Sequence, residues 1–328
     1  MELTTLKSRS SVYNYFRDDC NIETDHGIYL DVKLNDIDFD KLKIAVKNYI
    51  FKTLELFYSD KDFVDSDNFL VDYEDDILSL PNRTPNGAFY PKKDNINEYN
   101  IVQKEVNNIL MNERIGKNLK AAANVTVRVM DGKLNRFKGR MYATTKLHSD
   151  AWVGHEGDAV FTIGVLGDEK TTLEFNKPTG KIAKKFFEPV DNFDDGIRLF
   201  ESMEFIGNLK FGYATIFDHG CLHRTVKLGD GIRVSVEFGI IVKDSDGIRN
   251  NYGKNIVNSK GKSLPYENID DILKIGKNRF FFDQQYQQRN QQYQICFLHM
   301  FLAFQQFLHL QVRIWIFYIL LLCLLLLL

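Results

Sequence analysis

Two patterns of apolar residues divide the chain. Apolar residues at helical spacing run through Asp40–Phe57 and Asn97–Ile115, so both segments are predicted to be amphipathic helices. Further along, short runs rich in Val, Ile, Phe, Tyr and Thr are typical of strands. The predicted strands are Val125–Met130, Met141–Leu147, Ala159–Leu166, Thr171–Phe175, Leu209–Phe217, His223–Lys227 and Arg233–Val242. Many short strands in succession predict a β-sandwich or barrel.

These patterns predict a mainly β protein with flanking helices and four regions along the chain. The chain shows no strand–helix–strand alternation and no glycine-rich phosphate loop, which argues against a nucleotide-binding domain. The predicted regions are a mixed, partly helical one that buttresses the core (1–121), the strand-rich core (122–243), a polar extension with a short helix near Asp270–Ile275 (244–283), and a tail (284–328).

The composition mainly excludes classes of protein and of partner. The 328 residues carry a formal net charge of −2 and are 44% apolar and 26% charged, which is ordinary for a globular protein. This balance gives no reason to expect a nucleic-acid partner, which usually requires a basic face. The four cysteines form no CxxC pair, and the N-terminal residues lack the apolar core of a secretory signal. We therefore expect a cytoplasmic protein in a reducing environment.

The tail differs sharply from the rest of the chain. From Gln284 to Leu328 there is no Asp, Glu or Lys, and the sequence is rich first in Gln and then in Leu. Its last segment, Ile314–Leu328, is an uninterrupted run of 15 apolar residues, whereas a full membrane span needs about 20. Two interpretations stay open: a short tail anchor that would bring a membrane partner, or a dispensable, non-native sequence.

Candidate chemistry begins with a His-Ser-Asp motif. His148 and Asp150 are two positions apart, and residues at that spacing in a strand point to the same face. A second histidine would complete a set of two imidazoles and one carboxylate, a metal site typical of non-haem Fe(II) oxygenases. Both His223 and His219 lie downstream. We favour His223 as the ligand, because it begins a predicted strand, whereas His219 precedes a glycine in a predicted turn.

An Arg-Val-Ser motif follows His223 by ten residues. Arg233 and Ser235 share a strand face, and a guanidinium beside a hydroxyl is well suited to hold a carboxylate. The combination of His148, Asp150 and His223 with this motif resembles the 2-oxoglutarate and Fe(II)-dependent dioxygenase superfamily. The resemblance covers roughly residues 125–242.

The resemblance implies a fold, cofactors and a reaction. The fold would be a double-stranded β-helix, also called a jelly-roll. Fe(II) would be bound by His148, Asp150 and His223, while 2-oxoglutarate would pair with Arg233 and Ser235. With O2, such an enzyme would hydroxylate a substrate, which we expect to be a small molecule, and release succinate and CO2. An aspartate at position 150 argues against the halogenating branch, which has a small residue there.

Four further residues near the motif are candidates for ligand contacts. Tyr142 and Arg140 have the same strand parity as His148, which would point them into a barrel. We predict Tyr142 as a second donor to 2-oxoglutarate and Arg140 as a possible contact to an anionic substrate. Trp152 either lines the substrate cavity or packs in the core. His155, in a loop between glycines, is predicted to contact substrate.

A non-catalytic alternative also fits the sequence. A jelly-roll module that binds a metal or a ligand without turnover would present the same five motif residues. Binding of metal by the purified protein, followed by an assay for succinate, would separate the two functions.

Overall fold

The computed structural model describes residues 9–131, 140–154, 157–229, 231–243 and 267–274. The chain divides into two compact units, Met1–Arg279 and Phe280–Leu328, and every described residue lies in the first. The tail and its apolar run therefore lie outside the described residues. Among the residues that are described, no helix combines the length and apolar character needed to cross a membrane.

Two antiparallel sheets form the core. The larger has nine strands, and the smaller has three in the order β10-β7-β8. The main path of the larger sheet is β1 (Ile22–Asp25), β2 (Tyr29–Lys33), β9 (Tyr213–Asp218), β6 (Ala159–Gly167), β11 (Arg233–Val242), β4 (Leu119–Ala122) and β12 (Glu267–Asn268). Beside this path, β5 (Thr126–Met130) pairs with β11 and with β3 (Ala88–Phe89). The smaller sheet consists of β7 (Thr171–Ile182), β8 (Phe200–Asn208) and β10 (Leu222–Lys227).

The chain passes repeatedly between the sheets. β5, β6, β9 and β11 belong to the large sheet, whereas β7, β8 and β10 belong to the small one. An isolated bridge between His148 and His223 adds a short fourth segment beside β10. This alternation is the double-stranded β-helix, so the predicted fold class is confirmed.

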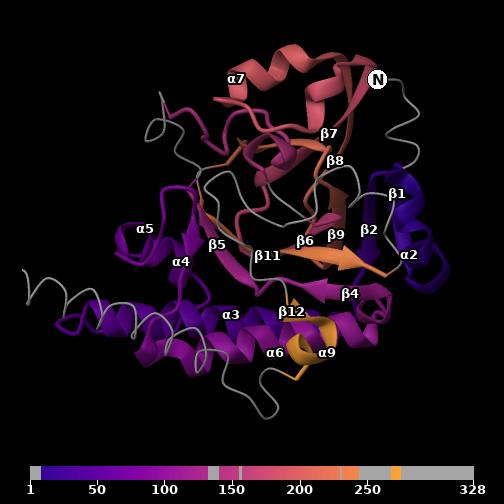
Figure 1. The fold of residues 1–328 in the computed structure, drawn as a ribbon. Coiled ribbons are helices and arrows are strands. Elements are labelled where there is room, and N and C mark those ends of the chain that lie inside the picture. The colour runs from indigo at the N-terminus through magenta and orange to yellow at the C-terminus, as the bar shows by residue number, and fades with distance from the viewer. Residues whose placement is uncertain (1–8, 132–139, 155–156, 230, 244–266, 275–328) are drawn as a thin grey trace, which may run out of the picture. The chain divides into compact units, whose positions relative to one another are not determined.

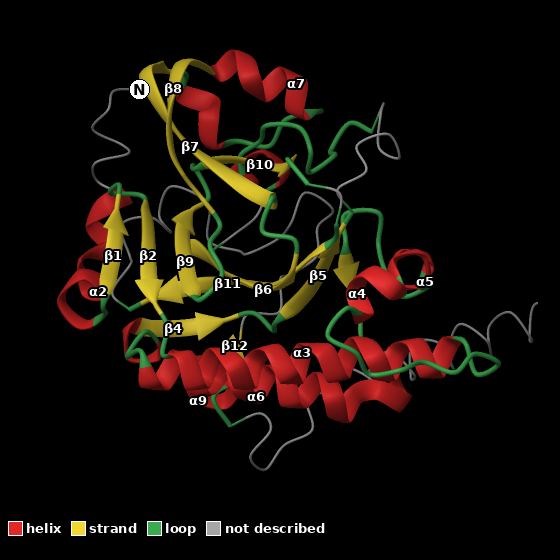
Figure 2. Ribbon diagram, turned by 180° about the vertical axis from the view of Figure 1, so that it is seen from behind, coloured by secondary structure: helices red, strands yellow, loops and turns green. Residues whose placement is uncertain are grey.

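Helices cover the outer face of the large sheet. Figures 1 and 2 show α3 (Asp36–Phe57) and α6 (Ile96–Asn112) side by side beneath it. α3 begins where the Asn35 side chain accepts hydrogen bonds from the backbone N–H groups of Ile37 and Asp38, which satisfies two free helix donors. One face of α3 is fully buried, through Leu42, Val46, Tyr49, Ile50 and Leu54. Both predicted helices are thus present and buttress the sheet.

The remaining helices are short. The α-helices are α2 (Asn14–Asp19), α4 (Phe69–Asp72), α5 (Glu74–Ser79), α7 (Phe193–Gly196) and α9 (Ile269–Ile272). The 3-10 helices are η1 (Ser11–Tyr13), η2 (Lys93–Asn95), η3 (Gly116–Asn118), η5 (Asp150–Val153), η6 (Lys184–Phe187) and η7 (Ile197–Leu199). α9 overlaps the short helix predicted near Asp270–Ile275.

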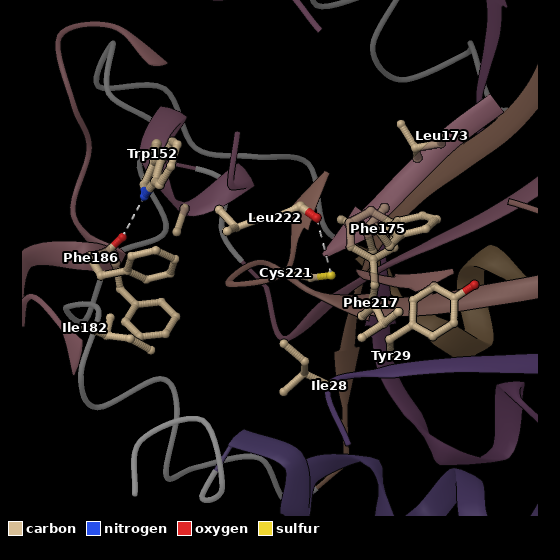
Figure 3. Packing of buried hydrophobic residues seen from close by; sticks show 14 of the residues in the cluster. Ile28, Tyr29, Trp152, Leu173, Phe175, Ile182, Phe186, Phe217, Cys221 and Leu222 are labelled. Carbon is tan, nitrogen blue, oxygen red and sulfur yellow. Dashed lines mark hydrogen bonds between the residues drawn. The ribbon is translucent and has the colours of Figure 1, made fainter. Parts of the chain in front are cut away.

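An aromatic core fills the space between the sheets. Phe175 of the small sheet contacts Tyr29 and Phe217 of the large sheet, with ring centroids 4.9 Å apart in both pairs. Trp152 is fully buried, and its indole N–H donates to the carbonyl of Phe186 at 2.9 Å (Figure 3). Tyr29 and Phe217 face this core. Every second residue along the paired strands of the large sheet, counted from the positions opposite these two, faces it as well.

Three predicted strands need correction. Leu209–Phe217 begins only at Tyr213, as β9. Met141–Leu147 is a series of turns: the Lys146 N–H donates to the Ala143 carbonyl within the segment, and the side chains of Tyr142 and Lys146 bond the backbone at 190–191 and Asp194 of α7. β7 does not end at Phe175 but continues to Ile182, through Pro178. Proline is tolerated there because β10 pairs with β7 only as far as Asn176, which leaves Pro178 on a sheet edge.

Six of the described strands were not predicted, namely β1, β2, β3, β4, β8 and β12, and β8 is the one of them that lies in the small sheet. β8 has exposed side chains at every position from 201 to 205, so burial does not alternate along this part of the strand. Its pairing with β7 alone identifies it as a strand.

Candidate metal centre and anion site

The two motif histidines are joined through their backbones. The N–H of His148 donates to the carbonyl of His223 at 3.0 Å, and the N–H of His223 donates back at 2.8 Å. This pairing places the two imidazoles side by side, with ring centroids 4.2 Å apart. Two residues far apart in the sequence are thereby held on the same side of the core.

Each imidazole is oriented by a carbonyl two residues earlier. Nδ1 of His148 lies 2.8 Å from the Lys146 carbonyl, and Nδ1 of His223 lies 3.1 Å from that of Cys221. A carbonyl only accepts, so each Nδ1 carries the proton and each Nε2 keeps a lone pair. Hydrogen bonds of this kind fix the tautomer and ring orientation of metal-binding histidines.

Asp150 completes the set. Its residue begins η5, and the Ser149 side chain caps this helix by accepting from the N–H of Ala151. Asp150 Oδ1 lies 3.6 Å from His223 Nε2, and the candidate ligand atoms of His148, Asp150 and His223 all lie within 4.8 Å of one another. Ligands about 2.0–2.2 Å from a common ion fit such spacing. The donor set of two imidazoles and one carboxylate suits a divalent transition metal with open positions.

Burial favours the metal-binding form of His148. The pKa of His148 is lowered to about 3, first by burial and second by the neighbouring His223, whereas Asp150 opposes the shift. The imidazole is therefore neutral near pH 7, with its lone pair available to a metal.

His219 lies beside this centre without being part of it. Its Nδ1 is 3.8 Å from Asp150 Oδ2, beyond hydrogen-bond distance, and it does not belong to the cluster of possible ligands. Its backbone carbonyl instead accepts from the Ser149 hydroxyl at 2.5 Å and from the Ala151 N–H at 3.3 Å. The turn that carries His219 thus supports the segment that carries Asp150, and the structure groups His223 with the motif, as we favoured.

A buried ion pair anchors this turn. Asp218 is fully buried and accepts from the Gly220 N–H at 2.7 Å. The same carboxylate accepts from Arg9 Nε at 2.8 and 2.9 Å, and the Arg9 guanidinium lies over the Phe187 ring. An arginine from the N-terminal segment therefore holds the turn next to the candidate metal centre. Sequence reasoning missed Arg9, since nothing in its local sequence marks it.

The predicted anion site lies on β11. Arg233 and Ser235 are 3% and 2% exposed, and their parity points both toward the core. Within the described part of the chain, Nε and Nη1 of Arg233 have no hydrogen-bond partner. Burial lowers the pKa of Arg233 to about 10, while Glu237 opposes the shift, so the guanidinium is still charged near pH 7. A buried charge with unsatisfied donors calls for an anionic ligand.

The remaining sequence candidates are placed differently. The Tyr142 hydroxyl lies 2.9 and 2.5 Å from the backbone carbonyls of Val190 and Asp191, so its single proton is already donated. Because its segment is not a strand, the parity argument that pointed Tyr142 and Arg140 inward does not hold; Arg140 is half-buried. Trp152 is fully buried in the aromatic core. His155 lies outside the described residues.

Two further residues near these sites were not predicted from the sequence. Phe193 stacks on His148 with ring centroids 4.3 Å apart, which covers one face of the imidazole. Arg128, on β5, forms an ion pair with Glu237. Its alternation with Val127 and Val129 was a usable signal, because it places a charge on the opposite face from two buried valines.

Comparisons with known proteins give structural likenesses alone. No family model matches the chain, and no curated protein matches it. AviO1 from Streptomyces viridochromogenes Tue57 is 11% identical, with 70% of this chain and 94% of AviO1 covered and a TM-score of 0.36. The non-heme alpha ketoglutarate dependent carbocyclase SnoK from nogalamycin biosynthesis is 9% identical, with 80% and 94% covered and a TM-score of 0.40. The epimerase SnoN, solved with Fe3+, alpha ketoglutarate and nogalamycin RO, is 12% identical, with 74% and 85% covered and a TM-score of 0.32. These likenesses therefore concern the fold alone.

Proposed function

We propose that the protein is an Fe(II)- and 2-oxoglutarate-dependent oxygenase that hydroxylates a small molecule with release of succinate and CO2. The observation that carries this proposal is the buried guanidinium of Arg233, with two nitrogens lacking partners among the described residues, in the same barrel as the His148, Asp150 and His223 cluster. A metal site alone would fit many proteins. A metal site combined with an unpaired buried cation fits a co-substrate that has an anionic end.

Each residue then has a defined task. His148 and His223 would hold the iron through Nε2, because their Nδ1 protons are committed to backbone carbonyls. Asp150 would supply the third ligand and leave the other coordination positions open. Arg233 and Ser235 would hold the distal carboxylate of 2-oxoglutarate by charge-assisted hydrogen bonds. When bound, the iron and 2-oxoglutarate supply the oxidising chemistry, and the barrel supplies orientation and exclusion of water.

The test is metal-dependent succinate formation. The purified chain is expected to bind Fe(II) and 2-oxoglutarate anaerobically. It should release succinate when O2 and a substrate that it can oxidise are supplied. His148→Ala and Asp150→Ala should each abolish succinate release, because two ligands do not hold the metal tightly. His26→Ala serves as a matched control, since His26 lies outside the ligand cluster.

Two outcomes would contradict the proposal in whole or in part. Normal turnover by His148→Ala or Asp150→Ala would remove the metal assignment. Tight metal binding without any 2-oxoglutarate binding would favour the non-catalytic jelly-roll module. A small-molecule substrate and a cytoplasmic location stay proposals from the sequence, and a screen of candidate substrates for succinate release addresses the first.

A further inference from the structure

Three charged side chains share one face of the β5–β11 pair. The register places Arg128 opposite Ser235, and Ser235 has the same parity as Arg233 and Glu237. Residues directly opposite each other in an antiparallel pair project to the same face. Arg128, Arg233 and Glu237 therefore all project toward the barrel interior, with Arg128 located between the other two along the sheet.

The two arginines of this group differ in their ion-pair and hydrogen-bond partners. Arg128 forms an ion pair with Glu237, and its Nη1 donates to the Asn86 carbonyl at 2.8 Å. The side chains of Arg128 and Glu237 are 22% and 23% exposed, so water screens their interaction in part. Arg233 is far more buried, yet its Nε and Nη1 lack partners among the described residues. The one carboxylate of the group thus neutralises the more exposed of the two arginines.

Glu237 is close enough to compete for Arg233. The two residues are four positions apart on the same strand face, about 13 Å between Cα atoms at roughly 3.3 Å per residue. Extended arginine and glutamate side chains can meet across that separation. Consistent with this, the charge of Glu237 raises the pKa of Arg233, and the charge of Arg128 lowers it. A Glu237 released from Arg128 would gain by pairing with the buried guanidinium.

We propose that Arg128 is a positioning residue that holds Glu237 away from Arg233 and so keeps the anion site open. The proposal rests on the proposed function, in which Arg233 binds the distal carboxylate of 2-oxoglutarate. The three side chains together carry one net positive charge, so one incoming carboxylate neutralises the group. Arg128 acts through Glu237 and does not itself contact the co-substrate.

The test is a double-mutant cycle on co-substrate affinity. Binding of 2-oxoglutarate to the full-length Fe(II) protein is measured anaerobically by calorimetry for the wild type, Arg128→Met, Glu237→Gln and the double variant. Arg128→Met should weaken binding by about tenfold or more, because Glu237 then occupies Arg233. Glu237→Gln should bind within about threefold of the wild type or more tightly. The double variant should recover to within about threefold of the wild type, because no competing carboxylate is left.

A matched control separates this effect from the general loss of a cross-strand ion pair. Arg224 and Glu174 form another arginine–glutamate pair between neighbouring strands, in the small sheet, at 3.1 Å. Arg224→Met should leave 2-oxoglutarate binding unchanged. Iron affinity is measured in every variant, and it should not change.

Several results would overturn the inference. A double variant as weak as Arg128→Met would mean that Arg128 contacts the ligand directly. Unchanged binding by Arg128→Met would mean that Glu237 does not compete. If Arg128→Met does not fold, Glu237→Gln still decides, since a tenfold loss there would contradict a competing role. Failure of the wild type to bind 2-oxoglutarate would instead reject the proposed function, which is a distinguishable result.

Discussion

Arg233 is a buried cation whose position in the fold carries an energetic cost. Its guanidinium is 3% exposed, with two nitrogens lacking partners in the described part of the chain. Burying an ionic group without an anion costs several kcal/mol even after relaxation. In the proposed function, the binding of a carboxylate would offset this cost, so ligand affinity and a lower stability of the ligand-free protein would have one origin.

We therefore expect opposite effects from Arg233→Met. Methionine keeps an apolar side chain of similar length, so the free protein should become more stable by about 1–3 kcal/mol. Binding of 2-oxoglutarate should be lost, by about 100-fold or more. Urea denaturation and calorimetry measure the two quantities. As a control, Arg198→Met at an exposed position should alter neither, and a destabilised Arg233→Met would contradict the argument.

At the scale of elements, the candidate metal centre depends on turns that connect strands. His223 is the second residue of β10, whereas Asp150 lies on η5, and the two are brought together by the His148–His223 bridge. The turn after β9 then supports the Asp150 segment through the His219 carbonyl. Because Arg9 holds this turn through Asp218, the N-terminal segment contributes to a site that is distant in sequence.

Arg9→Met is expected to destabilise the protein by about 3–5 kcal/mol, because it leaves Asp218 as a buried charge without its cation. Urea denaturation measures the change. The double variant with Asp218→Asn should recover part of the loss, since asparagine can still accept from Gly220. The exposed Lys52–Glu55 pair provides the control, and Lys52→Met should have little effect. An equally small effect of Arg9→Met would show that the pair does not hold the turn.

At the scale of the whole molecule, the described fold lies within the unit that ends at Arg279. Its two sheets enclose their own aromatic core, and α3 and α6 cover the large sheet. The described residues of both candidate sites lie within this unit.

We expect a chain that ends at Asp283 to keep its thermal unfolding midpoint and its affinities for Fe(II) and 2-oxoglutarate. Loss of either affinity would show that the tail serves the site. Sedimentation with lipid vesicles tests the tail-anchor interpretation: binding by the full chain, but not by the shortened one, would assign a membrane role to the tail.

The sequence by itself determined the local features of this protein. Strands with alternating or continuous apolar residues, such as Ala159–Leu166, were predictable because side-chain period reports burial. The candidate site was also visible in the sequence, because each motif is short and its residues are near neighbours in the chain. Its residues are His148, Asp150, His223, Arg233 and Ser235. β8 and the turns at 141–147 were not predictable, because exposed residues and loop contacts leave no periodic pattern.

Tertiary structure alone decided which distant residues meet. It paired His148 with His223, placed Arg9 on Asp218, and set Arg128 between Arg233 and Glu237. The physical reason is the register of the strands. Antiparallel pairing brings together positions that share no local signal, and a shift of one residue would move every side chain of a strand to the opposite face of the sheet. The sequence therefore fixes which chemistry is available, and the pairing of the strands decides where it is assembled.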